Sequence, residues 1–277
     1  MTSSDSPDFD RRRAKQLERT GFNRIAARYA EAAGARATLH EALLDASELA
    51  PGQDLLDLAS GPGVLAQAAW LRTASRSRIV ACDLAEGMLA ESRRRHPGIL
   101  HAAADAECLP FPAAHFDRVL CGLGLMIFPD EAQALAEMRR VLKPGGRIAV
   151  SVWATAEQVP LVECALACMR RILPAPKVAR PSVFRLGDPA RLKASIAAAG
   201  FRNIRIEACE LRCRFSDASA YWQAFLDLAG GAAASLARLP QETQARLRAE
   251  VAGELKPYAE GDGYRLNSRV LIATAAV

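Results

Sequence analysis

The chain has 277 residues, of which 51% are hydrophobic and 24% charged, and its formal net charge is +5. This composition is typical of a globular enzyme, and no apolar run approaches the roughly eighteen residues that span a bilayer. We therefore expect no membrane insertion. Because the basic residues form no stripe interleaved with aromatics, we also expect no nucleic-acid binding. Residues 1–13 are polar and charged, unlike a signal or transit peptide, which predicts a cytoplasmic protein.

Seven cysteines are spread along the chain without the dense spacing of a disulfide framework. Cys164 and Cys168 lie one helical turn apart, and Cys209 and Cys213 share one face of an expected strand. No Cys-x-x-Cys spacing or nearby histidine accompanies them, and free cysteine is among the most buried residue types. We therefore expect reduced core thiols and no metal site.

From residue 54 onward, short β-rich runs alternate with helical stretches. This alternation predicts a parallel sheet with helices on both faces. The expected strands are 54–58, 78–83, 99–103, 116–121 and 146–153. The expected helices are 64–71, 85–96 and 131–142, the last of which ends at the turn Lys143-Pro144-Gly145-Gly146.

The C-terminal half follows a different pattern. Asp188 caps a helix that runs to Ala199 and closes on Gly200, and a long alternating strand covers 203–215. A final strand, 265–275, follows after some fifty mostly helical residues and can pair antiparallel at the sheet edge. The fold class is therefore α/β, with a Rossmann-like, mostly parallel seven-stranded sheet and an antiparallel C-terminal edge strand.

Three segments lie outside the sheet pattern, namely 1–50, 154–187 and 216–263. We expect them to gather as a helical cap over the strand ends. The whole chain, 1–277, then forms a single domain in which 51–153 is the cofactor-binding core.

The most informative stretch is an apolar run that carries Asp57 and then breaks into Gly61 and Gly63. Glycine lets the turn adopt backbone angles closed to other residues, so a ligand can lie against the main chain. The following helix would aim its free N–H groups at the same place. This pattern predicts a cofactor site.

Further polar groups follow successive strands, where ligands of open α/β sheets bind. Asp83 closes the second expected strand and can accept both hydroxyls of a ribose, while Met88 can cover a purine ring. Asp105, after the third strand, can accept a hydrogen bond from an exocyclic amine. Each has an ordinary alternative, because Asp105 can form an Asx-turn and Met88 can belong to the core. The joint spacing favours the functional interpretation.

Together these residues resemble a known family. Residues 56–63, Leu-Asp-Leu-Ala-Ser-Gly-Pro-Gly, look like motif I of the class I S-adenosylmethionine-dependent methyltransferases. Residues 83–89, 105–112, 116–117 and 142–146 resemble the later motifs, and 22–29 resembles an early helix of the ubiquinone and menaquinone biosynthesis branch. Two departures stand out: Ala59 replaces the first motif I glycine, and residues 123–128 are apolar where the quinone enzymes carry a polar or histidine-bearing stretch.

The resemblance implies S-adenosyl-L-methionine as cofactor and a small, largely apolar acceptor. It implies that Asp83 holds the ribose, that Leu84 and Met88 flank the adenine and that Asp105 meets its amine. The methionine portion is approached by backbone at Ala59, Gly61 and Cys121, and Tyr29 closes over the cofactor. The full set of expected cofactor residues is Tyr29, Asp57, Ala59, Ser60, Gly61, Gly63, Asp83, Leu84, Met88, Asp105, Ala106 and Cys121.

Two alternative functions stay open. Residues 61–66 also fit G-x-G-x-x-A with Asp83 twenty residues past Gly63, which is the pattern of an NAD(P)-dependent oxidoreductase. Against it, Asp57 precedes the glycines and no Tyr-x-x-x-Lys pair offers a hydride-transfer partner. A noncatalytic ligand-binding protein on the same fold is the second alternative.

The acceptor site is expected in the cap. Phe215, Tyr221, Trp222 and Phe225 lie within eleven residues and either pack on the sheet or line that site. The stretch 159–173 is apolar almost all round, which suits a helix facing an apolar substrate or a second subunit, so a homodimer stays open. No catalytic residue is assigned, because His101, His115 and Tyr29 are candidates by motif position alone.

Overall fold

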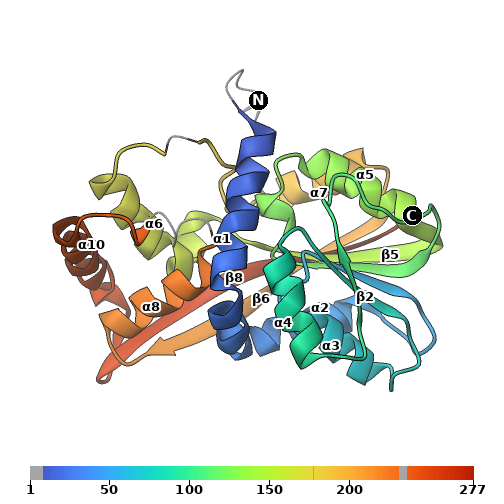
Figure 1. Cartoon of the computed structure of the whole chain (residues 1–277), viewed down its shortest axis with the longest axis horizontal. Helices are drawn as coiled ribbons and strands as arrows, with labels where there is room; N and C mark the ends of the chain where they lie inside the picture. Colours follow the sequence, from blue (N-terminus) through green and yellow to red (C-terminus); the bar gives the residue numbers. More distant parts are fainter. Residues whose placement is uncertain (1–8, 177, 231–235) are drawn as a thin grey trace.

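A single sheet organises the computed structural model, which describes residues 9–176, 178–230 and 236–277. Its strand order is β3-β2-β1-β4-β5-β8-β6, and the short β7 pairs with β8 (Figure 1). The strands are β1 (Leu55–Leu58), β2 (Ile79–Asp83), β3 (Leu100–Ala103), β4 (Phe116–Gly122), β5 (Leu142–Trp153), β6 (Arg202–Phe215), β7 (Ala259–Glu260) and β8 (Gly263–Ala276). The predicted strands are all present.

The first five strands in chain order pair in parallel. β8 runs antiparallel to both of its neighbours, with Val150 opposite Ala273 on β5 and Cys209 opposite Val270 on β6. The mostly parallel seven-stranded sheet is therefore confirmed, with the two-residue β7 as an addition. The C-terminal strand lies one position inside the edge, which β6 forms.

Helices cover both faces of the sheet, as the alternating pattern predicted. α2, α3 and α4 lie on one side, and α5 and α7 on the other (Figure 1). The α-helices are α1 (Arg11–Glu31), α2 (Ala37–Ser47), α3 (Val64–Arg72), α4 (Glu86–Arg95), α5 (Glu131–Val141), α6 (Pro160–Ile172), α7 (Pro189–Ala198), α8 (Ala218–Leu228) and α10 (Gln241–Glu254). No helix in the described ranges is both long and apolar enough to cross a membrane.

Adjacent residues of β1 show how one strand serves two cores. Leu55 packs in one buried cluster with Leu43 of α2 and Leu65 of α3. Leu56 packs in the other with Leu135 of α5. Successive side chains of a strand point to opposite faces, so a continuous apolar run is required where both faces are covered.

One part of the expected cap, α2, packs on the sheet. Leu39, Leu43 and Leu44 of α2 are at most 1% exposed, and α2 contacts β4, β5 and α3. Their spacing places three leucines on one side of a short helix, which is a stripe for packing on a flat surface. Residues 37–47 therefore pack on one face of the sheet.

The remaining cap helices gather around an extension of the sheet. β6 and β8 stay paired beyond Trp153, where β5 ends, and carry α6, α8 and α10 at their far end (Figure 1). The hydroxyl of Tyr221 on α8 donates to the carbonyl oxygen of Leu161 (3.0 Å) and accepts from the N–H of Ala165 (3.1 Å), so α8 is fixed to α6.

The predicted turn at Lys143–Gly146 lies inside a strand. β5 begins at Leu142, which pairs with Phe116, whereas the next pair joins Arg147 to Arg118. The register shift accommodates Gly145, whose φ is +77°. The strand expected at 146–153 therefore starts four residues earlier, because the chain turns within a β-bulge and not in a separate loop.

Candidate active site

The glycine turn after β1 adopts the left-handed backbone that its composition predicted. Gly61 has a φ of +54° and Gly63 one of +77°, and Ala59 takes the same region at +56°. An alanine in this region costs about 1–2 kcal/mol relative to the right-handed region. The Ser60 N–H donates to the carbonyl oxygen of Cys82 (3.1 Å), which holds the strained turn beside the end of β2.

Gly63 faces α4 and does not line a cavity. A Cβ added to Gly63 would lie 2.0 Å from the hydroxyl oxygen of Ser92, which is fully buried. Ser92 is itself fixed at 2.8 Å from the Nε2 of His101 on β3. Gly63 lines neither of the two cavities described below, and its missing side chain lets α4 pack against the turn.

Asp83 connects the ends of β1 and β2. Its Oδ2 accepts a hydrogen bond from the N–H of Gly61 (2.8 Å), and its Oδ1 accepts one from the N–H of Ala85 (2.8 Å). Burial raises the pKa of this carboxyl, and the two backbone donors oppose that rise. The side chain is thus held in one orientation before any ligand arrives.

A larger cavity of about 820 Å³, open to solvent, lies beyond the carboxyl ends of the strands. Its size is in the range of small-molecule and cofactor sites. Most of the expected cofactor residues line it, namely Tyr29, Ala59, Gly61, Asp83, Leu84, Met88, Asp105 and Ala106. Met88 is also part of a small core with Ile25 and Ala26 of α1, so it has both of the roles considered for it.

A smaller cavity adjoins the larger one and shares Tyr29, Gly61 and Leu123 with it. Asp57 and Ser60 line it, as expected, together with Arg36 and His40, which the sequence did not indicate. Both carboxyl oxygens of Asp57, the hydroxyl of Ser60 and the Nδ1 of His40 are buried without a hydrogen-bond partner among the described residues.

The titration of two residues reflects this buried, polar environment. Burial raises the pKa of Asp57 to about 8, the nearby backbone N–H of Ala66 opposes that rise, and the charge of Asp83 adds to it. Burial, together with the charge of Arg36, lowers the pKa of His40 to about 4. At neutral pH both side chains are therefore mostly uncharged.

Cys121 does not line either cavity. It is fully buried, and burial raises the pKa of its thiol to about 12. The next two residues, Gly122 and Leu123, line both cavities in its place. Leu123 has a φ of +56°, which is unusual for a bulky residue and is typical of a functional site.

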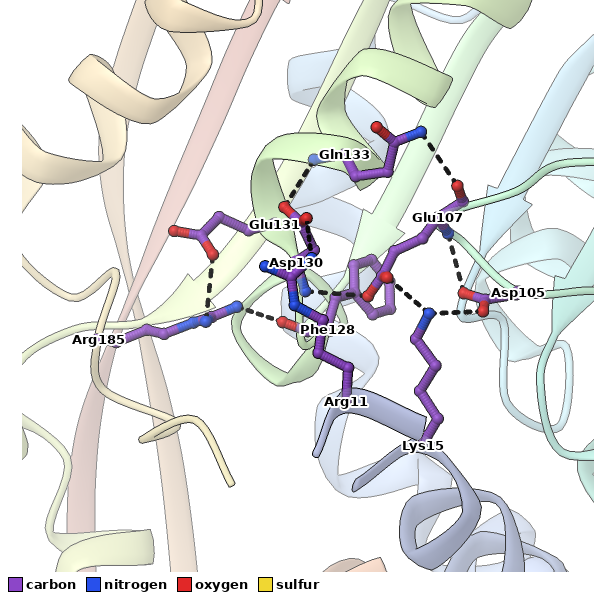
Figure 2. A network of polar contacts seen from close by, with 9 residues as sticks. All are labelled: Arg11, Lys15, Asp105, Glu107, Phe128, Asp130, Glu131, Gln133 and Arg185. Atoms are coloured by element: carbon purple, nitrogen blue, oxygen red, sulfur yellow. Dashed lines mark hydrogen bonds and ion pairs between the residues drawn. The ribbon is translucent and has the colours of Figure 1, made fainter. Parts of the chain in front are cut away.

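Asp105 is held by two partners at the rim of the larger cavity (Figure 2). Its Oδ1 accepts from the N–H of Glu107 (2.9 Å), which is the Asx-turn weighed as its ordinary role. Its Oδ2 accepts from the Nζ of Lys15 on α1 (2.6 Å), and the same ammonium donates to Glu107 (2.5 Å). Asp105 thus joins α1 to the loop after β3.

The same network ties the loop after β4 to this rim (Figure 2). The N–H of Asp130 donates to the carboxylate of Glu107 (2.9 Å), and Arg11 of α1 pairs with Asp130 (2.6 Å). Arg185, from the segment before α7, pairs with Glu131 (3.1 Å) and donates to the carbonyl oxygen of Phe128. Four separate segments therefore form one polar rim.

The predicted aromatic cluster packs as core. Tyr221 is fully buried, while Trp222 and Phe225 are stacked at 5.6 Å and less than 10% exposed. None of these lines either of the two cavities. Phe22, Ile127 and Phe128 provide the apolar walls instead, and of these Phe22 lies in the early-helix pattern that the sequence had indicated.

Comparison with known proteins agrees with this geometry. A family model described as a methyltransferase domain matches residues 56–150. The demethylmenaquinone methyltransferase of Beutenbergia cavernae is 40% identical over 119 residues, which are 43% of this chain and 48% of that enzyme. The chain thus spans about half the length of this relative.

A second relative matches over a longer region. The ubiquinone/menaquinone biosynthesis C-methyltransferase UbiE of Edwardsiella ictaluri is 33% identical over 177 residues, covering 58% of this chain and 70% of that enzyme. Among solved structures, phosphoethanolamine N-methyltransferase 2 of Haemonchus contortus, in complex with S-adenosyl-L-methionine, has a TM-score of 0.54 at 18% identity. That match covers 86% of this chain and 52% of the other.

Proposed function

Because this chain belongs to the class I S-adenosylmethionine-dependent methyltransferases, whose methyl donor is S-adenosylmethionine, we propose that it transfers that methyl group to a small, largely apolar acceptor. One observation carries the proposal. Asp57 and Asp83, on adjacent parallel strands, serve two adjoining cavities that meet at the glycine turn. Such a site suits a long ligand with a nucleoside at one end and a polar group at the other.

The residues present fit this cofactor. Asp83 lies in the larger cavity, where it can accept from the ribose hydroxyls with the lone pairs that Gly61 and Ala85 leave free. Leu84 and Met88 provide apolar surface for the adenine in the same cavity. Asp57 lines the smaller cavity, and its unpartnered carboxyl oxygens can accept a hydrogen bond from a donor group of a ligand bound there.

The chain's contribution to the reaction is mainly positioning. S-adenosylmethionine supplies a methyl group that its sulfonium charge has already activated. The glycine turn, Tyr29 and Leu123 lie where the two cavities meet and can orient a nucleophile while keeping water out. Orientation of this kind can supply about 7–11 kcal/mol of a barrier, so no catalytic dyad is required.

The acceptor is proposed to lie against the apolar wall of the larger cavity. Phe22, Ile127 and Phe128 form this wall and come from α1 and the loop after β4. A wall of this kind favours an apolar, partly aromatic molecule. The named relatives make a short-chain demethylmenaquinone the first acceptor to test.

Calorimetry tests the cofactor assignment. We expect S-adenosylhomocysteine to bind and NADH to show no heat of binding. Tight binding of NADH with no response to S-adenosylhomocysteine would instead support the oxidoreductase alternative. The sheet argues against it, because β8 is antiparallel where dinucleotide-binding sheets continue in parallel.

Mass spectrometry tests the acceptor. Incubation with S-adenosylmethionine and short-chain demethylmenaquinone should yield a product heavier by one methylene group. Binding of S-adenosylhomocysteine without methylation of this quinone, or of any compound in a metabolite extract, would favour the noncatalytic ligand-binding protein.

A further inference from the structure

The edge strand β6 leaves one side of its backbone unpaired. It is 14 residues long, contains no proline and pairs with β8 alone. Among the described residues, no backbone hydrogen bond joins its outer side to another segment. The regular part of its ladder runs from Arg205 to Phe215 without a register shift. An edge of this length offers a row of N–H and C=O groups to another strand, and natural proteins usually block such edges.

The far half of β6 is open on one face as well as along its edge. Beyond Cys209 the sheet is reduced to β6 and β8, joined at the far end by the short β7. On the open face, the side chains of Glu210, Arg212 and Arg214 are 49%, 71% and 74% exposed. The opposite face packs on the core through Leu211, which is 4% exposed. A further strand can therefore join this edge without rearrangement of the core.

Symmetry limits how β6 can pair with a second copy of itself. Two copies of one strand that join edge to edge in antiparallel order are related by a two-fold axis perpendicular to the sheet. Each face stays on its own side, so the axis passes through one residue, and residues equally far before and after it lie opposite each other. Most of the regular ladder stays paired only if the axis passes through Cys209, Glu210 or Leu211.

Only one of these arrangements compensates the exposed charges. An axis at Glu210 places this carboxylate opposite its own copy, which is unfavourable. An axis at Cys209 places Glu210 opposite an alanine, so its charge is not compensated. An axis at Leu211 places Glu210 of each copy opposite Arg212 of the other, and no like charges lie opposite each other along the ladder. Cross-strand pairs of opposite charge are stabilising, so β6 is self-complementary about Leu211.

We propose that the chain forms a homodimer in which two copies of β6 pair antiparallel about Leu211, so that the sheet continues across the interface. The charges that oppose unspecific pairing at this edge then select a single register. This interface differs from the one considered for the apolar stretch 159–173, because α6 packs on α8, α10 and β8 of its own chain. The proposal goes beyond methyl transfer and does not depend on it, since no residue of β6 lines either cavity.

The first test measures whether the chain associates. Sedimentation velocity of the wild-type protein over a range of concentrations should show a monomer–dimer equilibrium. Added salt should weaken the dimer, because the charges that pair across the interface are exposed. A protein that stays monomeric up to about 0.5 mM would overturn the proposal.

Charge reversal identifies the interface. Arg212→Glu puts a carboxylate opposite Glu210 of the other copy, and Glu210→Arg puts a guanidinium opposite Arg212. Each variant alone should dimerise about tenfold more weakly, because both attractive cross-strand contacts become repulsive. An equimolar mixture of the two variants should dimerise like the wild type, because each cross-strand pair then has opposite charges. Both variants lose the ion pair between these residues within one chain (3.2 Å), and mixing does not restore it.

Glu207→Arg is the matched control. Glu207 is exposed on the same strand and the change in charge is the same, but an axis at Leu211 places it opposite Phe215. This variant should dimerise as strongly as the wild type, and thermal unfolding verifies that each variant is folded. A weaker dimer in Glu207→Arg, or a mixture of the two charge-reversed variants that stays monomeric, would refute this register.

Cross-linking checks the register independently. With the axis at Leu211, Cys209 of one copy lies opposite Cys213 of the other, and both side chains are partly exposed. A short bis-maleimide should join the two copies in a Cys108→Ser protein, in which the exposed Cys108 cannot react. Cys209→Ser and Cys213→Ser should each lose the cross-link, and an equal mixture of the two should regain it. A cross-link that persists in either variant alone would contradict the proposed pairing.

Discussion

The carboxylate of Asp83 accepts a 2.8 Å hydrogen bond from the N–H of Gly61, so the residue assigned to the ribose also holds the glycine turn in place. The second oxygen accepts a hydrogen bond from the N–H of Ala85, the residue directly before α4. One side chain thus holds two backbone segments that line the larger cavity. Changes at Asp83 should therefore affect folding and binding together.

Asp83→Ala should lower the free energy of unfolding by about 1–3 kcal/mol, because it removes two hydrogen bonds that the carboxylate accepts from backbone N–H groups. It should also weaken S-adenosylhomocysteine by about tenfold or more. Urea denaturation and calorimetry measure the two effects. Asp188→Ala is the control, since Asp188 accepts from the N–H of Ala190 at the start of α7 and should lose stability only. Unchanged affinity in Asp83→Ala would refute the ribose assignment.

Gly63→Ala should destabilise the protein by about 2–4 kcal/mol, the sum of a left-handed alanine and a steric clash. The new Cβ would lie 2.0 Å from the Ser92 hydroxyl oxygen. Gly145 has the same φ of +77° but nothing within 4 Å, so Gly145→Ala should cost only about 1 kcal/mol. Thermal or urea unfolding of both variants compares them, and equal losses would show that packing against α4 is unimportant.

Ala59→Gly should stabilise the protein by about 0.5–1 kcal/mol, because relief of the left-handed alanine outweighs the greater freedom of glycine in the unfolded chain. Ala114, with a φ of +53° in an exposed loop, provides the control. Ala114→Gly should show a similar gain in urea denaturation. Only Ala59→Gly should change cofactor affinity, and a destabilised Ala59→Gly would mean that the alanine methyl makes compensating contacts.

The stability of the ligand-free protein should fall as pH rises from about 4 to 8, and Asp57→Asn should flatten this dependence. Burial raises the pKa of Asp57 from an ordinary 3.8 to about 8 in the folded chain. Between these values the unfolded chain has lost a proton that the folded chain keeps, so raising the pH favours unfolding. Urea denaturation at pH 5, 7 and 9 measures the slope, and identical slopes in both proteins would place the titration elsewhere.

Local motifs in the sequence predicted much of the fold and part of the site. The turn at Ala59 to Gly63 and the carboxylate at Asp83 depend on a few neighbouring residues, so their conformations could be anticipated. The mostly parallel sheet is confirmed because alternating strand and helix patterns with short connections allow few topologies. The conformation of Lys143–Gly146 was not anticipated from its local sequence, since a glycine turn and a β-bulge can have the same composition.

The residue at which a strand ends was harder to predict. β4 extends one residue beyond its expected end, to Gly122. Cys121 is buried in the core, and the two residues after it, Gly122 and Leu123, line both cavities. A difference of one or two residues at the end of a strand therefore decides which part of the chain borders a cavity.

By itself the sequence determined the α/β fold, the glycine turn and the carboxylates at the ends of β1 and β2, since each is encoded by residues close together in the chain. Only the tertiary structure decided that Arg36 and His40 share a cavity with Asp57 and that Lys15 reaches Asp105. These residues come from helical segments that are distant in sequence from the strands they reach. The periodicity of a helix shows which of its faces is apolar, but it does not show which strand end that helix packs beside. The packing of α1 and α2 on the sheet supplies that information.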